Sequence, residues 1–345
     1  MSPPNIPPVS EVALRERILT ILEIVAVYAG GAVLGVLLAK LAGVELRNPM
    51  LAIAENPEQN LLPIAGDLAV LLLWQYFGWL LCASALRGVR GRLEAVRGDG
   101  ARVAPGRLLF LGLVVACLVT LPQHSIGLAQ HYLGLGEMAP WRAALLASQW
   151  DMDFWVLMAV GSFGLIPLIE EAFYRGWMLS RLRHALHPGL AVLFTAGLFA
   201  LSHSQYLRWD ALNLLTLASI IFGGGVYALV TIHARSLWPA ILAHAVINVP
   251  LTPTLEWLQL AVMAVFLWLT WPVWADFRAA AAKAFAGLSW RKVLAALLGG
   301  GALALALSQF QELMALVGLT LWLGLLAYYA HRRWRKGSRV PVGQR

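Results

Sequence analysis

Long apolar runs separated by short polar segments dominate the pattern along the chain. A bilayer core of ~30 Å is crossed by a helix of roughly 20 mostly apolar residues, and several runs reach or approach that length. They are Ile18–Ala39, Leu62–Leu86, Leu108–Leu121, Leu255–Trp274, Val293–Leu307 and Leu313–Ala330. The pattern predicts an all-α polytopic bundle of about eight to ten transmembrane helices. Ile18–Ala39 is longer than the apolar core of a signal peptide, so we expect it to be a retained first span.

Composition and charge support a membrane protein. Hydrophobic residues make up 60% of the chain and charged residues 13%, whereas a soluble domain carries about a quarter charged residues. The net charge of +8 is concentrated in a few segments between the apolar runs and in the tail after Ala330. By the positive-inside rule these basic segments are cytoplasmic, and alternate counting of the spans then puts both termini in the cytoplasm. The basic charge therefore follows the membrane and does not indicate nucleic-acid binding.

The chain divides by character, although we expect residues 1–345 to form a single integral membrane domain. Residues 1–150 hold N-terminal scaffold spans, residues 151–250 a catalytic core, and residues 251–345 C-terminal spans with a basic tail. Only the central section combines short apolar helices with many polar side chains. Three successive glycines, 223–225, lie within one of its spans, where they allow close helix approach or introduce a kink.

Two adjacent carboxylates and an arginine interrupt one of these central apolar helices, in the segment GSFGLIPLIEEAFYRGWML. A charged side chain within a bilayer costs at least ~2.5 kcal/mol and usually marks a functional interior site. The spacing of four between Glu171 and Arg175 suits a helical ion pair. Glu170 is then left to act as a base or an acid.

Three further polar residues follow on two short apolar helices. His203 ends the segment LFALSH, on a short apolar helix that begins near Pro188. His244 and Asn248 lie four residues apart in LWPAILAHAVINV. The spacing of four puts an imidazole and a carboxamide on one helix face, where two donors can stabilise an oxyanion. A carboxylate and a second histidine opposite them can activate water. These parts suit amide hydrolysis without a covalent intermediate.

The three segments also resemble the ordered motifs of a known family. EEAFYR, FALSH and HAVIN are similar to the EExxxR, FxxxH and HxxxN motifs of the CPBP (CAAX protease and bacteriocin-processing, Abi) family, which includes the type II CAAX prenyl endopeptidases. The resemblance implies a glutamate-type intramembrane protease in which Glu170 and His203 activate water and His244 and Asn248 form the oxyanion hole. Glu171 and Arg175 would support the site. Ala172 stands where the family usually has a larger apolar residue, and this departure concerns the substrate and not the chemistry.

Other functions are compatible with the same residues. Glu170, His203 and His244 could instead be zinc ligands, because two histidines and a glutamate form a known catalytic set, although the metal-free reading is our expectation. A non-catalytic membrane immunity or transport protein is the other alternative, since transporters also carry charged residues and glycine breaks in their spans. We expect a membrane-associated peptide or protein as substrate, a location in a prokaryotic cytoplasmic membrane, and no nucleic-acid partner. The sequence does not indicate the oligomeric state.

Overall fold

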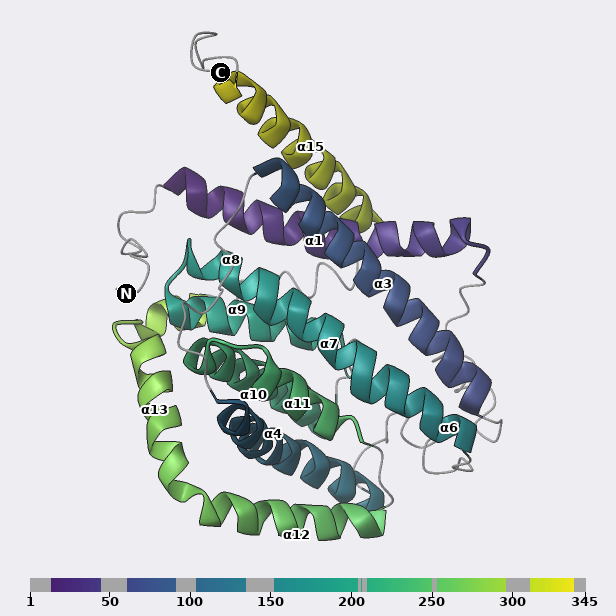
Figure 1. Ribbon diagram of the computed structural model, residues 1–345, viewed down its shortest axis with the longest axis vertical. Coiled ribbons are helices and arrows are strands. Elements are labelled where there is room, and N and C mark those ends of the chain that lie inside the picture. The colour runs from purple at the N-terminus through teal and green to yellow at the C-terminus, as the bar shows by residue number, and fades with distance from the viewer. Residues whose placement is uncertain are drawn as a thin grey trace.

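The computed structural model describes residues 14–44, 61–90, 104–134, 152–203, 206, 210–249, 253–295 and 311–337. Within these ranges all regular structure is helical, as predicted, and no strand occurs. The main helices are α1 (Leu14–Leu41), α3 (Leu61–Arg90), α4 (Pro105–Leu133), α6 (Met152–Leu157), η2 (Met158–Leu165), α7 (Ile166–Glu171), η3 (Ala172–Met178), α8 (Leu179–Arg183), α9 (Pro188–Leu201), α10 (Ala211–Ala234), α11 (Trp238–Ile247), α12 (Pro253–Leu269), α13 (Trp271–Phe285) and α15 (Gln311–Gly337). Figure 1 shows the helices of the central section between two groups of flanking helices.

Long apolar helices make the chain an integral membrane protein. Among the described helices, α1, α4 and α10 are long and apolar enough to cross a membrane, and the bent pair α12 and α13 is a fourth candidate. The apolar run Leu255–Trp274 is not one straight helix, because α12 ends at Leu269 and α13 turns away by 74°. Pro272 near the start of α13 lacks the N–H that would continue the helix. The larger span count and the orientation of the termini stay predictions, and most of Val293–Leu307 lies outside the described residues.

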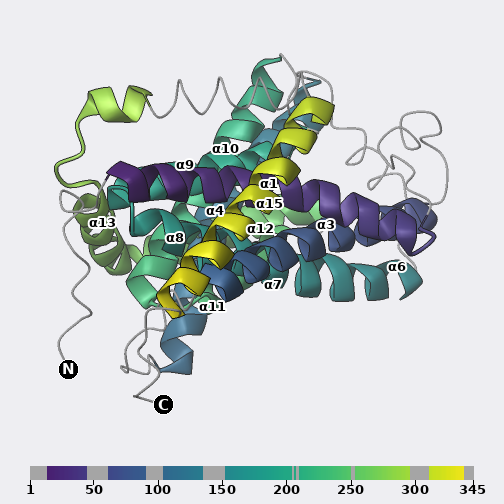
Figure 2. The ribbon, with the colours of Figure 1, turned by 90° about the horizontal axis from the view of Figure 1, so that it is seen from above.

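The first flanking group consists of α1, α3 and α15, which pack on one another. Figure 2 shows α15 crossing α1 and α3. Glycines allow α1 and α3 to touch along their backbones, because a Cβ on Gly78 would lie 2.2 Å from the Gly31 carbonyl oxygen and one on Gly35 would lie 2.4 Å from that of Trp74. The buried Trp79 ring then stacks on Phe173 of η3, at 4.8 Å between ring centroids. The first group is thereby joined to the central section.

A buried ion pair also ties this group to the central section. Arg181 of α8 donates to the Glu23 carboxylate of α1 at 2.6 Å, and the Tyr329 hydroxyl of α15 donates to the same carboxylate. Both charged side chains are almost fully buried. Glu23 therefore has a structural role, because its carboxylate holds α8 and α15 against α1.

Removing one partner of this pair should destabilise the protein strongly. For Arg181→Leu we expect a loss of about 3–5 kcal/mol in the free energy of unfolding, because the Glu23 charge stays buried without its cation. Denaturant unfolding in detergent measures the change. Arg183→Leu on the same helix is the matched control, because Arg183 is only half-buried and forms no ion pair among the described residues. An equal effect of the two substitutions would contradict the assigned role of the Glu23–Arg181 pair.

The second flanking group consists of α12 and α13, which with α4 cover the other side of the core (Figure 1). Helix α4 packs on α10, α11 and α12. His124 of α4 is buried, with Nδ1 3.8 Å from Glu256 Oε1 of α12. The apolar run that was assigned to this span ends at Leu121, but the helix continues to Leu133.

Candidate active site

The two glutamates lie on a helical segment of unusual geometry. Residues 152–183 form one continuous run in which the α-helical α7 is flanked by the π-helical segments η2 and η3. π-Helical turns are rare and occur frequently at functional sites. Glu170 and Glu171 are both buried at the end of α7, where α7 packs against α11. The helix therefore directs two adjacent carboxylates into the protein interior.

Glu171 and Arg175 form the ion pair that their spacing suggested. Arg175 Nη1 lies 2.8 Å from Glu171 Oε1, and neither side chain is exposed. Arg175 Nη2 donates to the Gly224 carbonyl oxygen of α10 at 3.1 Å. The guanidinium also lies over the rings of Phe199 and Tyr227, 4.4 and 5.1 Å from their centroids. Arg175 is thus held by a carboxylate, a carbonyl and two aromatic faces.

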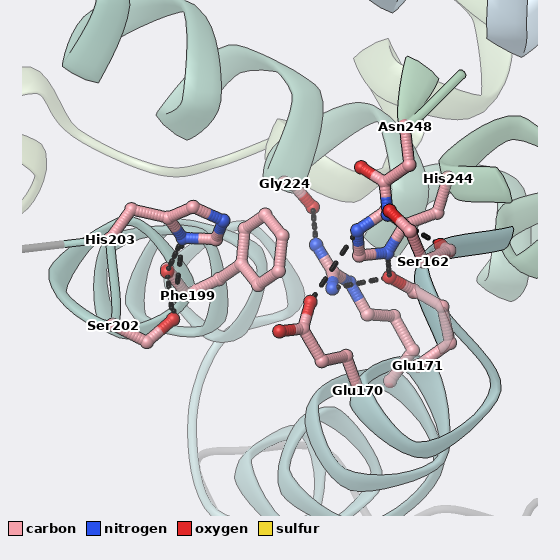
Figure 3. A network of polar contacts seen from close by, with 10 residues as sticks. Ser162, Glu170, Glu171, Phe199, Ser202, His203, Gly224, His244 and Asn248 are labelled. Carbon is pink, nitrogen blue, oxygen red and sulfur yellow. Dashed lines mark hydrogen bonds and ion pairs between the residues drawn. The ribbon is translucent and has the colours of Figure 1, made fainter. Parts of the chain in front are cut away.

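His244 joins the two glutamates (Figure 3). Its Nδ1 lies 2.9 Å from Glu171 Oε1 and its Nε2 lies 3.4 Å from Glu170 Oε2. An ionised carboxylate can only accept, so Nδ1 carries the proton that Glu171 binds. The ring also stacks on Tyr227, with 5.6 Å between centroids. Glu171 therefore fixes both Arg175 and the orientation of His244.

Glu170 differs from its neighbour in its surroundings. Its carboxylate is buried, and its Oε2 has no hydrogen-bond partner in the described part of the protein. His244 Nε2 lies 3.4 Å from that oxygen. A buried carboxylate without hydrogen bonds is costly, so it requires a reason beyond stability.

Asn248 lies one turn after His244, at the end of α11. Its carboxamide nitrogen donates to the Ser162 carbonyl oxygen of η2 at 2.9 Å. One of the two amide protons is used in this bond, which leaves the second for another acceptor. Figure 3 shows the carboxamide on the same side as the His244 ring.

His203 stands apart from this cluster. Helix α9 begins at Pro188 as predicted but ends at Leu201, so His203 follows the helix end. Its Nδ1 lies 2.9 Å from the Phe199 carbonyl oxygen, which accepts the proton and leaves Nε2 as the acceptor of the ring. Within the described residues no hydrogen bond or ion pair joins His203 to Glu170. The Phe199 ring lies between His203 and the cluster in Figure 3 and contacts both His203 and His244, at 4.8 and 5.7 Å between centroids.

Three contributors to the site were not predicted as site residues. Phe199 separates the histidines, Tyr227 stacks on His244, and Gly224 accepts from Arg175. The run of three glycines at 223–225 was the feature of the sequence that pointed to Gly224. A Cβ on Gly224 would lie 3.1 Å from Ala196 Cα of α9, and α10 continues through the glycines without a break. Close helix approach, and not a kink, is the role of Gly224.

A zinc site would require three ligands around one point. Among the side chains that the structure describes, no group of three or more His, Cys, Asp and Glu residues is arranged to hold a metal ion. His203 lies across the Phe199 ring from the other two proposed ligands. The three residues named for the zinc alternative are thus not gathered around one point in this structure.

Comparison with known families identifies this part of the chain. Residues 152–250, under a third of the sequence, match the family described as "Type II CAAX prenyl endopeptidase Rce1-like". We refer to this matched segment as the Rce1-like domain. The match agrees with the resemblance to the CPBP family, and it supports a protease of the CAAX type in general. No curated protein matches the chain, and no solved structure matches it.

The boundaries of the Rce1-like domain enclose the whole site. The matched segment extends from residue 152, at the start of α6, to residue 250, just after α11. It includes every polar contact of this site. The flanking groups α1–α3–α15 and α12–α13 lie outside them.

Proposed function

We propose that this protein is an intramembrane endopeptidase that cleaves a membrane-associated peptide or protein with water activated by Glu170 and His203. The observation that carries the proposal is the Glu170 carboxylate, which is buried and has no hydrogen bond to Oε2. It faces His244 in an Rce1-like domain. A carboxylate kept in this environment is suited to accept a proton from water.

His203 supplies the second acceptor. Because its Nδ1–H is bound by the Phe199 carbonyl, its Nε2 lone pair is available to a water molecule. As the water oxygen bonds to the carbonyl carbon of the substrate, its proton passes to Glu170 or His203. The same proton then passes to the amine nitrogen as the C–N bond breaks. No covalent enzyme intermediate is required.

The developing oxyanion is stabilised by donors from α11. His244 lies beside two carboxylates, and its Nε2 can donate to the oxyanion when that nitrogen carries a proton. Asn248 offers the amide proton that Ser162 does not use. Fixed donors in a water-poor site stabilise charge without reorganisation, and each is worth roughly 10²–10³ in rate.

Activity in proteoliposomes tests the proposal directly. The purified protein is incubated with a membrane-anchored peptide library, and products are identified by mass spectrometry. For His203→Ala we expect a loss of roughly 10²–10⁴-fold in cleavage rate. His331→Ala is the control because His331 lies on α15, outside the Rce1-like domain. Undiminished cleavage by His203→Ala would contradict the proposed water activation, and a binding-only immunity or transport protein would give no specific products.

The same assay distinguishes the zinc alternative. We expect cleavage to continue at its full rate after treatment with a chelator followed by desalting, because the proposed steps involve no metal. A loss of activity that zinc restores would establish a metalloprotease using some of these residues.

The substrate and the membrane follow from more general arguments. A C-terminal tail, a leader or a sorting segment near the membrane would reach a site buried among helices. The positive-inside pattern favours a prokaryotic cytoplasmic membrane. Products from the peptide library would show which of the three segments is cleaved.

A further inference from the structure

A separate cavity lies behind the active-site ion pair. It has a volume of about 340 Å³ and is enclosed by α3, the η3–α8 segment and the turn from α10 to α11. Arg175 is buried in its wall, whereas Arg87 and Arg235 are exposed. The cavity thus extends from the surface to the residue that pairs with Glu171.

The lining of this cavity is basic. Four arginines and one histidine contribute to it, and none of the lining residues carries a carboxylate: the basic residues are Arg87, Arg175, Arg181, His184 and Arg235. Arg175 and Arg181 have carboxylate partners, Glu171 and Glu23. Arg87 and Arg235 form no ion pair with any described residue. Two guanidinium charges are therefore available to an anion.

Arg175 and Thr231 belong to the cavity lining, but they are almost fully buried, at 1% and 6% exposed. Arg175 Nε and Thr231 Oγ1 have no hydrogen-bond partner in the described part of the protein and are closed off from solvent. The basic groups open to an anion are therefore the exposed guanidiniums of Arg87 and Arg235.

Arg235 adds a conformational observation. It has φ of 49°, and it is the one residue other than glycine with positive φ in the described part of the chain. It caps α10, a position at which glycine or asparagine is usual. A non-glycine residue held in this conformation costs free energy and often belongs to a functional site.

The neighbouring apolar residues place the cavity at a membrane surface. Leu80, Trp177 and Leu237 line it beside the basic groups. Trp238, next along the chain, is 63% exposed at the start of α11, and tryptophan is enriched where a membrane meets water. Basic pockets between transmembrane helices bind the phosphates of anionic lipids. An apolar wall beside a basic one matches an acyl chain beside its headgroup and does not match a fully hydrated anion.

We propose that this cavity binds the phosphate headgroup of an anionic phospholipid. Arg87 and Arg235 contact the phosphate, and Leu80 and Leu237 contact the acyl chains. The bound lipid lies beside Arg175, which holds Glu171, so lipid composition would influence the active site. This binding does not depend on the hydrolytic activity.

Lipid binding to the full-length protein in detergent tests the proposal. The probes are phosphatidylglycerol and phosphatidylcholine, titrated separately and measured by native mass spectrometry. We expect phosphatidylglycerol to bind more tightly, and the double variant R87Q/R235Q to lose about tenfold in affinity for it. R278Q/K283Q is the matched control, because it removes two positive charges from exposed positions on α13. Glu170→Gln should bind phosphatidylglycerol like the wild type, which separates this proposal from the proposed function.

Four outcomes would overturn the proposal. Equal binding of the two lipids, or an equal effect of both double variants, would show no specific headgroup site. Displacement of the lipid by millimolar inorganic phosphate would identify a site for the free anion. Displacement by a peptide with a free C-terminal carboxylate, but not by its amide, would identify the cavity as a substrate subsite.

Discussion

Glu170→Gln should reduce cleavage of the membrane peptide by roughly 10²–10⁴-fold, the usual contribution of a positioned base. Glutamine has nearly the same shape as glutamate but cannot accept the proton of the attacking water. Because Glu170 Oε2 has no hydrogen bond to lose, the substitution should not destabilise the fold. Removal of a buried charge should instead leave the free energy of unfolding unchanged or raise it by about 1 kcal/mol, as is common when active-site strain is relieved. Initial rates and denaturant unfolding measure the two effects.

Glu23→Gln is the matched control for this prediction. Glu23 is also a buried glutamate in an apolar helix, but it is bonded to Arg181 and Tyr329. We expect its substitution to lower stability by about 3 kcal/mol or more, because Arg181 is left buried with a weaker partner. Cleavage per folded molecule should be unaffected. If Glu170→Gln behaved like Glu23→Gln, Glu170 would be a structural residue and not a base.

Glu171→Ala should damage stability and activity together. The substitution leaves Arg175 buried without its carboxylate, which costs about 3–5 kcal/mol. It also removes the acceptor of His244 Nδ1–H, so the imidazole is no longer fixed toward Glu170. A misplacement of 1 Å costs about 10²-fold in rate. Unfolding in detergent and kcat with the membrane peptide measure the two losses.

A double variant separates the two roles of Glu171. Replacing both members of a buried ion pair by apolar residues is often neutral, so Glu171→Leu with Arg175→Leu should recover much of the lost stability. Activity should not recover, because His244 still lacks its acceptor. Recovery of both would mean that Glu171 acts only through Arg175, and the positioning of His244 by Glu171 would be wrong.

The local parts of the site could be predicted from spacing along the chain. Glu171 and Arg175 are four positions apart, as are His244 and Asn248. An α-helix brings residues at this spacing to one face. The Glu171–Arg175 ion pair is present in the fold. The start of α9 at Pro188 was also predictable, because proline is favoured in the first helical turn.

Contacts between helices could not be predicted in the same way. Spacing does not specify which carboxylate His244 contacts, and the fold brings it to both. It also does not reveal that the Phe199 ring lies beside His203. The apolar run Leu108–Leu121 ends before His124, but the helix continues through this residue and packs against α12, which buries the imidazole near Glu256.

The sequence by itself determined that the chain is a helical membrane protein, and it predicted that the chemistry lies in residues 151–250. Hydrophobic runs and motif spacing are local properties, and a bilayer permits few structures other than helices. Only the tertiary structure decided how the six polar residues are grouped. It joined Glu170, Glu171, Arg175 and His244 into one buried cluster, bonded Asn248 to η2, and left His203 beyond Phe199. These relations depend on how close the helices approach, and that distance is set by side-chain packing and by small residues such as Gly224.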